Sequence, residues 1–166
     1  MAAPDPKVHR MPSTEDLGIV DGLVQLSFFV QGVLGRVATA YDVSIIQARL
    51  LGVLRDRELG MAHLARVLNL DKSSTTGLVD RAEGRGLVRR RTVPEDGRAV
   101  HVVLTAKGDK LARAFAAEVG AEVGAAVEVL SATKRRQLSL LASQVVLHDA
   151  ALQGLDLSIG RSGVAQ

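Results

Sequence analysis

Residues 44–104 carry the pattern that most constrains the fold of this chain, because several short helix signals there are followed by strand signals. Ser44 and Gln47 match a capping box, in which an N-cap hydroxyl and a glutamine three residues later satisfy free backbone N–H groups. They predict a short helix, roughly three turns long. Gly60 marks a break, and the apolar spacing over residues 61–68 predicts another short helix.

The next predicted helix, over residues 72–84, is unusually polar. Asp71 is a good N-cap for it, and Asn69 can adopt a left-handed turn just before. Gly77 and Gly84 each cost about 1 kcal/mol against alanine inside a helix, so tertiary packing must hold this segment. The residues available to face a core are Thr75, Leu78, Val79 and Ala82. Small hydroxyl side chains and the bare backbone at Gly77 would let another backbone come close.

Two β-rich runs follow. Gly86 ends the polar helix, and residues 87–93 and 100–104 are predicted strands. The turn between them is Pro94-Glu95-Asp96-Gly97, with proline early and Asp-Gly late. An isolated hairpin is marginal in water, so this one must rest on the helices.

A long helix is predicted on each side of this region. Ser13 or Thr14 caps the first, over roughly residues 14–40, which is apolar on more than one face. It is either a fully buried central helix or a dimer interface. Thr105 caps a helix over residues 106–129 with apolar residues at every fourth position.

Ser131 caps a last predicted helix, which carries an apolar face that ends at Leu152. Its start, from Ser131 to Lys134, also matches an S-x-x-K nucleophile motif. The S-D-N and K-T-G elements of that enzyme class are missing, so a helix cap is the better interpretation.

The basic charge is concentrated in one stretch. The chain carries 21 Lys and Arg against 18 Asp and Glu, a net charge of +3. Residues 72–101 hold seven of those positive and four of those negative side chains, so the whole surplus lies there. Such a block indicates a polyanion contact, although a solvated Arg-rich strand would look the same.

Composition excludes several classes of protein. The length of 166 residues suits one domain with an extension. There is no cysteine, which excludes disulfides, thiolate zinc sites and thiol redox sensing. Three Phe, one Tyr and no Trp disfavour a protein that stacks single-stranded bases. The four histidines show no short-range ligand spacing, so we expect no metal and no cofactor, and no catalytic motif supports an enzyme.

A membrane location is not expected. No apolar run reaches the roughly 18 residues that span a bilayer, and residues 1–12 lack the apolar core of a signal peptide. We therefore expect a cytoplasmic protein that makes no membrane contact.

The order of these elements is that of a winged helix-turn-helix, and residues 41–111 resemble the MarR family of bacterial transcription regulators. The matching segments are residues 44–47, 61–68, 74–81, 85–90, 96–98 and 102–108. Asp96-Gly97-Arg98 is the most specific of them. Gly97 stands where the family commonly has a second arginine, Ala82 where leucine is usual and Asn69 where glycine is frequent.

The resemblance implies a homodimer that binds double-stranded DNA. The N-terminal part of the polar helix would enter the major groove. The predicted hairpin over residues 87–104, which is the wing of this fold, would enter the adjacent minor groove. The expected DNA-binding residues are Lys72, Ser73, Ser74, Thr76, Gly77, Arg81, Arg90, Asp96 and Arg98. In this interpretation the hydroxyls donate to phosphates or base edges, and Asp96 orients Arg98.

Many members of the family bind an anionic aromatic or phenolic ligand between the dimer helices and the winged lobe. The segments that could line such a pocket suggest Phe28, Tyr41, Arg49 and His63 as ligand contacts. Ligand binding there would change the spacing of the two recognition helices and release DNA.

The predicted fold is therefore mainly α with a small β-hairpin. The expected organisation is a disordered tail (1–12), an N-terminal dimerisation helix (13–43), a DNA-binding lobe (44–104), C-terminal dimerisation helices (105–152) and a flexible tail (153–166). We expect a dimeric repressor of a palindromic operator. The alternatives are an architectural DNA-binding protein without a ligand and a helical protein-interaction dimer.

Overall fold

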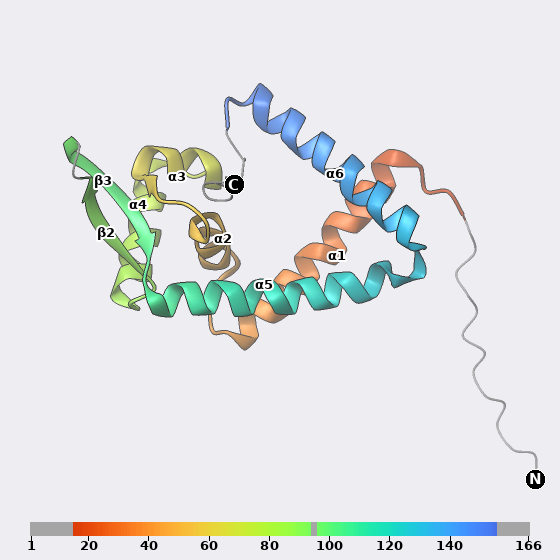
Figure 1. Cartoon of the computed structure of the whole chain (residues 1–166), viewed down its shortest axis with the longest axis horizontal. Helices are drawn as coiled ribbons and strands as arrows, with labels where there is room; N and C mark the ends of the chain where they lie inside the picture. The colour runs from red at the N-terminus through yellow and green to blue at the C-terminus, as the bar shows by residue number, and fades with distance from the viewer. Residues whose placement is uncertain (1–14, 94–95, 156–166) are drawn as a thin grey trace, which may run out of the picture.

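The computed structural model describes residues 15–93 and 96–155, and for residues 93 and 96–99 it describes the backbone without the side chains (Figure 1). The elements in chain order are α1 (Gly18–Ala40), α2 (Ile45–Leu54), β1 (Leu59–Gly60), α3 (Met61–Leu68), α4 (Lys72–Gly84), β2 (Val88–Val93), β3 (Asp96–Leu104), α5 (Ala106–Ala126), the 3-10 turn η1 (Val127–Val129) and α6 (Ala132–Leu152). This is the predicted mainly α winged helix-turn-helix.

Local signals set most helix starts. Ser44 forms the full capping box with Gln47, and the side chains of Asp71, Thr105 and Ser131 each accept a hydrogen bond from the backbone N–H three residues on. Asn69 adopts the predicted left-handed conformation, with φ of 54°. These caps confirm the sequence prediction.

The first helix begins later than predicted. Among the described residues α1 starts at Gly18, whose N–H donates to Asp16 Oδ1 at 2.8 Å. The predicted caps Ser13 and Thr14 lie outside the described residues. At the other end of the fold, α5 ends at Ala126, and its predicted last turn is the 3-10 turn η1.

The sheet has one strand more than predicted. The strand order is β1-β3-β2, and both pairs of strands are antiparallel. Val102 of the central strand β3 lies opposite Leu59 of β1 on one side and opposite Arg90 of β2 on the other. The sequence showed Gly60 only as a break, because two residues are too short for an alternating pattern. The pairing with β3 makes it a strand.

One core holds the winged lobe together. It is built from buried aliphatic side chains of α2, α3, α4 and the sheet, with Leu50, Leu64 and Val79 fully buried. Thr75, Leu78, Val79 and Ala82 are the buried residues of α4, as predicted. The start of α5 joins this core through Ala112.

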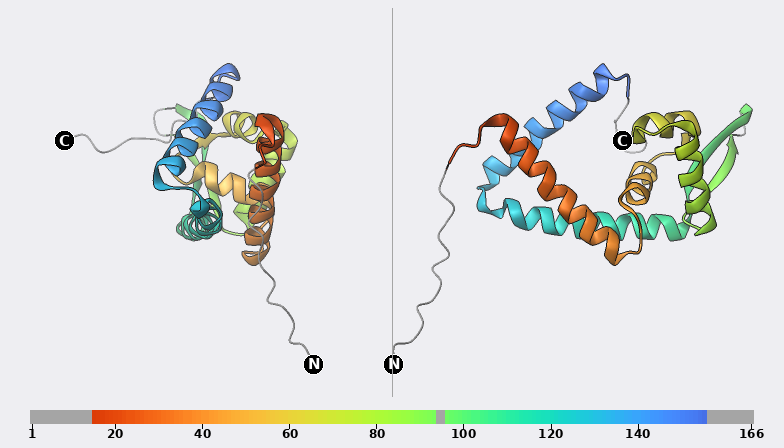
Figure 2. Two further views of the ribbon diagram at one scale, coloured as in Figure 1. Left: turned by 90° about the vertical axis from the view of Figure 1, so that its right-hand side faces the viewer. Right: turned by 180° about the vertical axis from the view of Figure 1, so that it is seen from behind.

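The long helices extend beyond the lobe. Helix α5 packs against α1 and α2, and α1 crosses it in the view from behind (Figure 2, right). Helix α6 runs back toward the lobe without packing on it (Figure 1), and residues 131–149 are all exposed. Exposed apolar side chains on α1 and α6 include Ile19, Val20, Leu23, Phe28, Leu140, Leu141, Val145, Val146 and Leu152.

Helix α1 bears on the expectation that no apolar segment of this chain is long enough to span a membrane. Its length and a mean hydropathy of 1.4 make Gly18–Ala40 long and apolar enough to cross a membrane by composition alone. Asp21 and Arg36 interrupt the apolar residues, so no uninterrupted apolar run is this long, but they are the only charged residues on the helix. The core helix of a soluble protein passes the same test.

Candidate nucleic-acid interface and apolar pocket

The N-terminus of α4 is organised around the carboxylate of Asp71. Asp71 Oδ1 accepts from the backbone N–H of Ser74 at 2.8 Å and from Ser73 Oγ at 2.6 Å, and Oδ2 accepts from Ser74 Oγ at 2.6 Å. The hydrogen bonds from the hydroxyls of Ser73 and Ser74 and from the Ser74 N–H hold the pKa of Asp71 well below its ordinary value of 3.8. The carboxylate is therefore ionised and can only accept.

This network changes the predicted role of the hydroxyl groups. A serine or threonine hydroxyl has one proton, and those of Ser73 and Ser74 are donated to Asp71. The hydroxyl of Thr76 donates to the backbone carbonyl of Lys72 at 2.9 Å. The prediction that these groups donate to DNA does not fit the free protein, in which only their oxygen lone pairs are available.

The outer face of α4 is otherwise as open as the sequence suggested. Lys72, Ser73, Ser74 and Arg81 are exposed. Arg81 Nη1 lies over Gly77, only 3.3 Å from where a Cβ of that residue would be. A shallow hollow of about 330 Å³ lies here, lined by Ile46, Leu70, Ser73, Ser74, Gly77, Leu78 and Arg81.

Arg90, which was expected to contact DNA, forms two ion pairs within the fold. Its guanidinium donates to Asp80 Oδ1 at 2.7 Å and to Glu83 Oε2 at 2.5 Å, while its backbone N–H donates to Glu83 Oε1 at 3.0 Å. The hydrogen bonds to Asp80 and then Glu83 raise the pKa of Arg90. This side chain joins β2 to α4, and two of its five N–H donors are used in these bonds.

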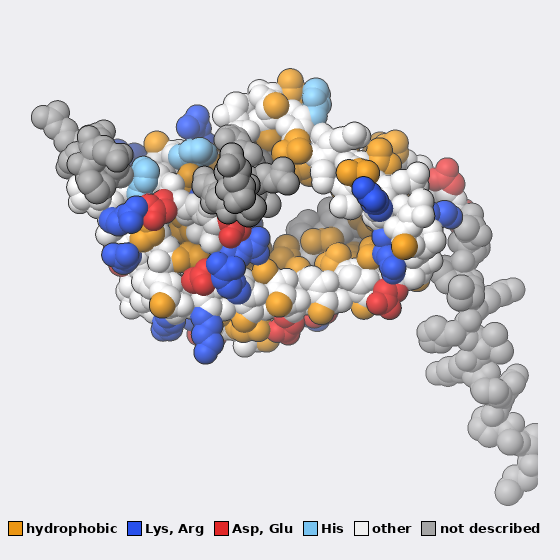
Figure 3. Space-filling model, in the orientation of Figure 1, with side chains coloured by type: hydrophobic (Ala, Val, Ile, Leu, Met, Phe, Trp, Pro, Cys, Tyr) orange, Lys and Arg blue, Asp and Glu red, His pale blue; other side chains and the backbone are white. Residues whose placement is uncertain are grey.

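The wing residues are only partly described. Asp96 and Arg98 lie at the start of β3, close to the turn, and their side chains are outside the described part of the structure. The predicted Asp96–Arg98 pair therefore stays a prediction. Elsewhere in the hairpin, Arg91 pairs with Glu58 and ties β2 to the loop before β1. In Figure 3 many of the visible Lys and Arg side chains lie over the lobe.

An apolar pocket of about 400 Å³ lies between α2 and α5, with Leu34 of α1 at its side. Its lining is Leu34, Val43, Ile45, Ala48, Arg49, Leu51, Gly52, Leu111, Ala112, Phe115, Ala116, Val119, Gly120 and Val123. Arg49 is the one charged residue in this lining. An apolar cavity with a single cation at its edge suits a small aromatic anion.

Only one of the four suggested ligand contacts lines this pocket. Arg49 does, whereas Phe28 is 60% exposed on α1 and His63 is on α3, neither of them in the lining. Tyr41 packs edge-on against Phe115, with ring centroids 6.2 Å apart. A hydrogen bond to Glu118 raises the pKa of Tyr41. The sequence missed Phe115 as a lining residue because its four-residue repeat indicated only a packing stripe.

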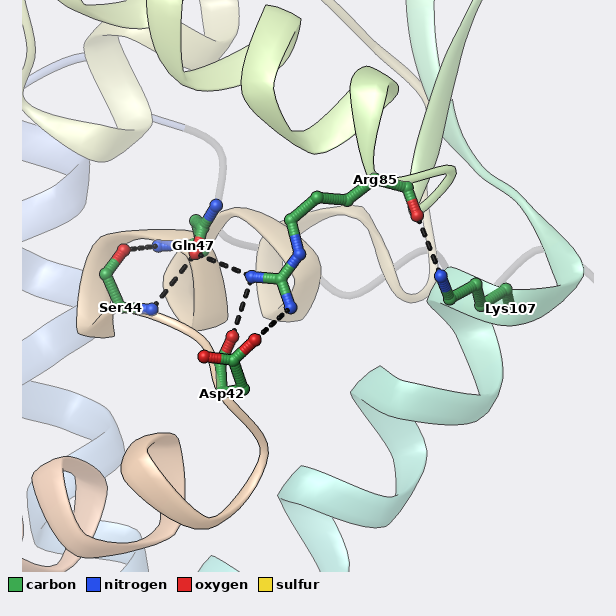
Figure 4. Close-up of polar contacts among 5 residues, drawn as sticks. All are labelled: Asp42, Ser44, Gln47, Arg85 and Lys107. Atoms are coloured by element: carbon green, nitrogen blue, oxygen red, sulfur yellow. Dashed lines mark hydrogen bonds and ion pairs between the residues drawn. The ribbon is translucent and has the colours of Figure 1, made fainter.

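Arg85 connects the polar helix to the pocket side of the molecule (Figure 4). Its guanidinium donates to the backbone carbonyl of Asp42 at 2.6 Å, to Asp42 Oδ2 at 3.2 Å and to Gln47 Oε1 at 3.4 Å. Lys107 Nζ donates to the Arg85 carbonyl at 2.9 Å. The α1–α2 turn, the end of α4 and the start of α5 thus meet at one residue, and we call this set of contacts the Arg85 junction.

This junction could not be predicted from the sequence. Arg85 and Asp42 are 43 residues apart, and neither belongs to a pattern that links them. The one available signal was Asp42 itself, since Asp and Asn tolerate positive φ, and Asp42 has φ of 52°. Within the described residues no cluster of three or more metal-ligating side chains occurs.

A polar recognition helix, preceded by a short helix and followed by a basic hairpin, defines a winged helix-turn-helix protein. Residues 41–99 match the model of the MarR family. This segment of the chain is therefore similar to the MarR family, whose members are transcriptional regulators.

Relatives agree with this assignment. The HTH-type transcriptional regulator YfiV of Bacillus subtilis is 31% identical over 96 residues, which cover 57% of this chain and 60% of YfiV. The chain therefore spans about three fifths of the length of that curated relative. The crystal structure of NadR in complex with 4-hydroxyphenylacetate is 28% identical, with a TM-score of 0.65 over 81% of this chain and 97% of NadR. Wild-type apo MarR from E. coli, at 23% identity and a TM-score of 0.66 over 79% and 98% of the two chains, shows the same fold.

Proposed function

We propose that this protein is a repressor that binds double-stranded DNA as a homodimer and is released by a small anionic aromatic ligand. The observation that carries the proposal is the outer face of α4, which is exposed, polar and interrupted by Gly77. It belongs to the segment that holds the whole net charge of +3. A basic lobe with such a helix suits entry into a major groove.

A second copy would complete the fold. A helix of 21 residues whose leucine and valine side chains are all exposed gains little from burial, and isolated helices are marginal. Leu140, Leu141 and Val145 are each more than half exposed on α6, and Ile19 and Phe28 on α1. We place these faces in a two-fold interface, which also accounts for the apolar composition of α1 without a membrane.

The pocket beside Arg49 supports the release step. NadR was crystallised with 4-hydroxyphenylacetate, a phenolic carboxylate. The pocket here has an apolar lining that includes one arginine, Arg49. A ligand in this pocket would contact α2 and α5. The Arg85 junction joins the α1–α2 turn and the start of α5 to the end of α4, so a shift of these elements on ligand binding would reach the recognition helix.

DNA binding is tested by titrating the purified protein with its own upstream intergenic DNA at two salt concentrations, with an unrelated duplex as competitor. We expect tight binding that survives the competitor. Arg81→Ala and Arg98→Ala should each weaken it and lower the salt slope by about one unit. Arg113→Ala, which removes an exposed arginine of α5 paired with Asp109, is the control and should change neither.

Two outcomes would favour the alternatives. Equal binding to both duplexes would indicate an architectural protein, and absence of binding a protein-interaction dimer.

The pocket is tested by thermal unfolding with a panel of aromatic carboxylates that includes 4-hydroxyphenylacetate. At least one should raise the Tm of the wild type and release DNA. Arg49→Gln should lose most of the Tm shift while keeping its own Tm close to that of the wild type, because Arg49 is exposed. An equal shift in both proteins would place the ligand elsewhere.

A further inference from the structure

We propose that Ser73 and Ser74 read DNA as hydrogen-bond acceptors and select base pairs that present an exocyclic amino group in the major groove, cytosine N4 or adenine N6. This inference rests on the proposed function and makes it specific. It assigns a defined chemical preference to two residues of the recognition helix.

The first step is the fixed direction of the two hydroxyl protons. Both serine oxygens lie 2.6 Å from a carboxylate oxygen of Asp71, one on Oδ1 and one on Oδ2. An ionised carboxylate has no proton to give, so each hydroxyl must be the donor. Hydrogen bonds of this length to a charged acceptor are the strong kind. The Ser74 N–H, at 2.8 Å from Oδ1, holds the carboxylate in place.

The second step concerns the hydrogen-bonding capacity that the two serine oxygens still have toward DNA. Both serines are exposed, and each oxygen keeps its lone pairs for an incoming group. The residues lie in the first turn of α4, the part of a recognition helix that reaches base edges. Gly77, one turn further on, has no side chain of its own, and the long side chain of Arg81 lies over it.

The third step is the chemistry of the groove. Phosphate oxygens, guanine N7 and O6, adenine N7 and thymine O4 are all acceptors, and they gain nothing from a second acceptor. The major-groove donors of DNA are the amino groups of cytosine and adenine. Serines fixed as acceptors therefore favour C and A at the positions they face, and they add nothing to phosphate binding.

Rotating a serine toward a phosphate is disfavoured. The rotation would remove a donor from Asp71 at the moment when a second negative charge, the phosphate, comes near. The pairing with Asp71 is thus strengthened by the approach of DNA.

The test uses base analogues that lack only the amino group. In the bound site each adenine is replaced in turn by purine, and each cytosine by 2-pyrimidinone, and affinities are measured for wild type, Ser73→Ala and Ser74→Ala. We expect wild type to lose about 3- to 10-fold at one or two positions per half-site, the value of a single hydrogen bond. The matching alanine variant should show no such loss at its position.

Comparing each variant with wild type on the same analogue cancels any weakening of the duplex itself.

Asp71→Asn provides a second readout. Asparagine is also a good N-cap, but its amide donates as well as accepts, so one serine proton becomes free. The preference at that position should shift from C or A toward G or T.

Equal losses on the analogues in wild type and both alanine variants, together with an unchanged preference in Asp71→Asn, would overturn the inference while DNA binding stands. Failure to bind any duplex would instead overturn the proposed function.

Discussion

Gly108 is the residue whose side chain the fold cannot accommodate. It lies at the third position of α5, where a Cβ would come within 1.9 Å of the backbone carbonyl oxygen of Leu87. The same carbonyl accepts a hydrogen bond from the Thr105 N–H at 3.1 Å, so it cannot move without breaking the junction between β2 and α5.

Gly108→Ala should therefore destabilise the protein by at least about 2 kcal/mol, since backbone atoms rather than a flexible side chain must give way. Urea unfolding at one fixed protein concentration measures it. Gly84→Ala is the matched control, because nothing lies within 4 Å of its added Cβ, and it should be neutral or gain up to about 1 kcal/mol. Equal values for the two variants would contradict the close approach.

Asp71 predicts a pH effect. Its pKa is lowered in the fold from 3.8, so its contribution to stability is present above that value and is lost as pH falls below it. Asp71→Asn keeps an N-cap but does not titrate. We expect unfolding midpoints of the wild type to fall more steeply than those of the variant as pH drops below about 4. Parallel curves would show that the carboxylate is not held as described.

Roles that depend on neighbours close in the sequence were predictable, whereas roles that depend on contacts between elements were not. The N-caps Ser44, Asp71, Thr105 and Ser131 were predictable because a cap depends on neighbours within three residues. The ion pairs of Arg90 were not predicted because its partners, Asp80 and Glu83, belong to another element, and its contact with DNA stays a prediction. A run of arginines in sequence does not show which of them already has partners in the fold.

At the scale of elements, long periodic helices were predicted well and a two-residue strand was not. The predicted bounds of α4 match the structure because Asp71 and Gly86 mark its two ends, with φ of 68° at Gly86. β1 exists only through its pairing with β3, which no local pattern can show. The pocket could not be predicted for the same reason, because it forms only where α2 and α5 come together in the fold.

The Arg85 junction makes a prediction about how α4 is held to the α1–α2 turn. The Asp42 carboxylate is almost fully exposed, whereas the Asp42 carbonyl takes the shortest of the contacts with Arg85. Exposed ion pairs contribute little, so the backbone contact should dominate. Arg85→Ala should lower the free energy of unfolding by about 1 kcal/mol, and Asp42→Asn by clearly less.

Urea unfolding of both variants distinguishes these contributions, since asparagine also tolerates the positive φ at this position. A larger loss in Asp42→Asn than in Arg85→Ala would show that the ion pair, and not the carbonyl, carries the contact.

For the whole molecule, the exposed apolar faces tie folding to association. A chain that ends at Leu130 lacks α6 and therefore the exposed apolar face that α6 carries. We expect it to be monomeric or aggregated in sedimentation experiments, and we expect the full chain to sediment as a dimer. The Tm of the full chain should rise with protein concentration, because association favours the folded state. A stable dimer of the shortened chain would move the interface away from α6.

The separation of α6 from the winged lobe has a genetic consequence. A copy with a defective α4 but an intact α6 would still associate with normal copies and place one inactive lobe in each mixed pair. Alleles that alter the recognition helix should then be dominant over the wild type, while alleles that delete α6 should be recessive.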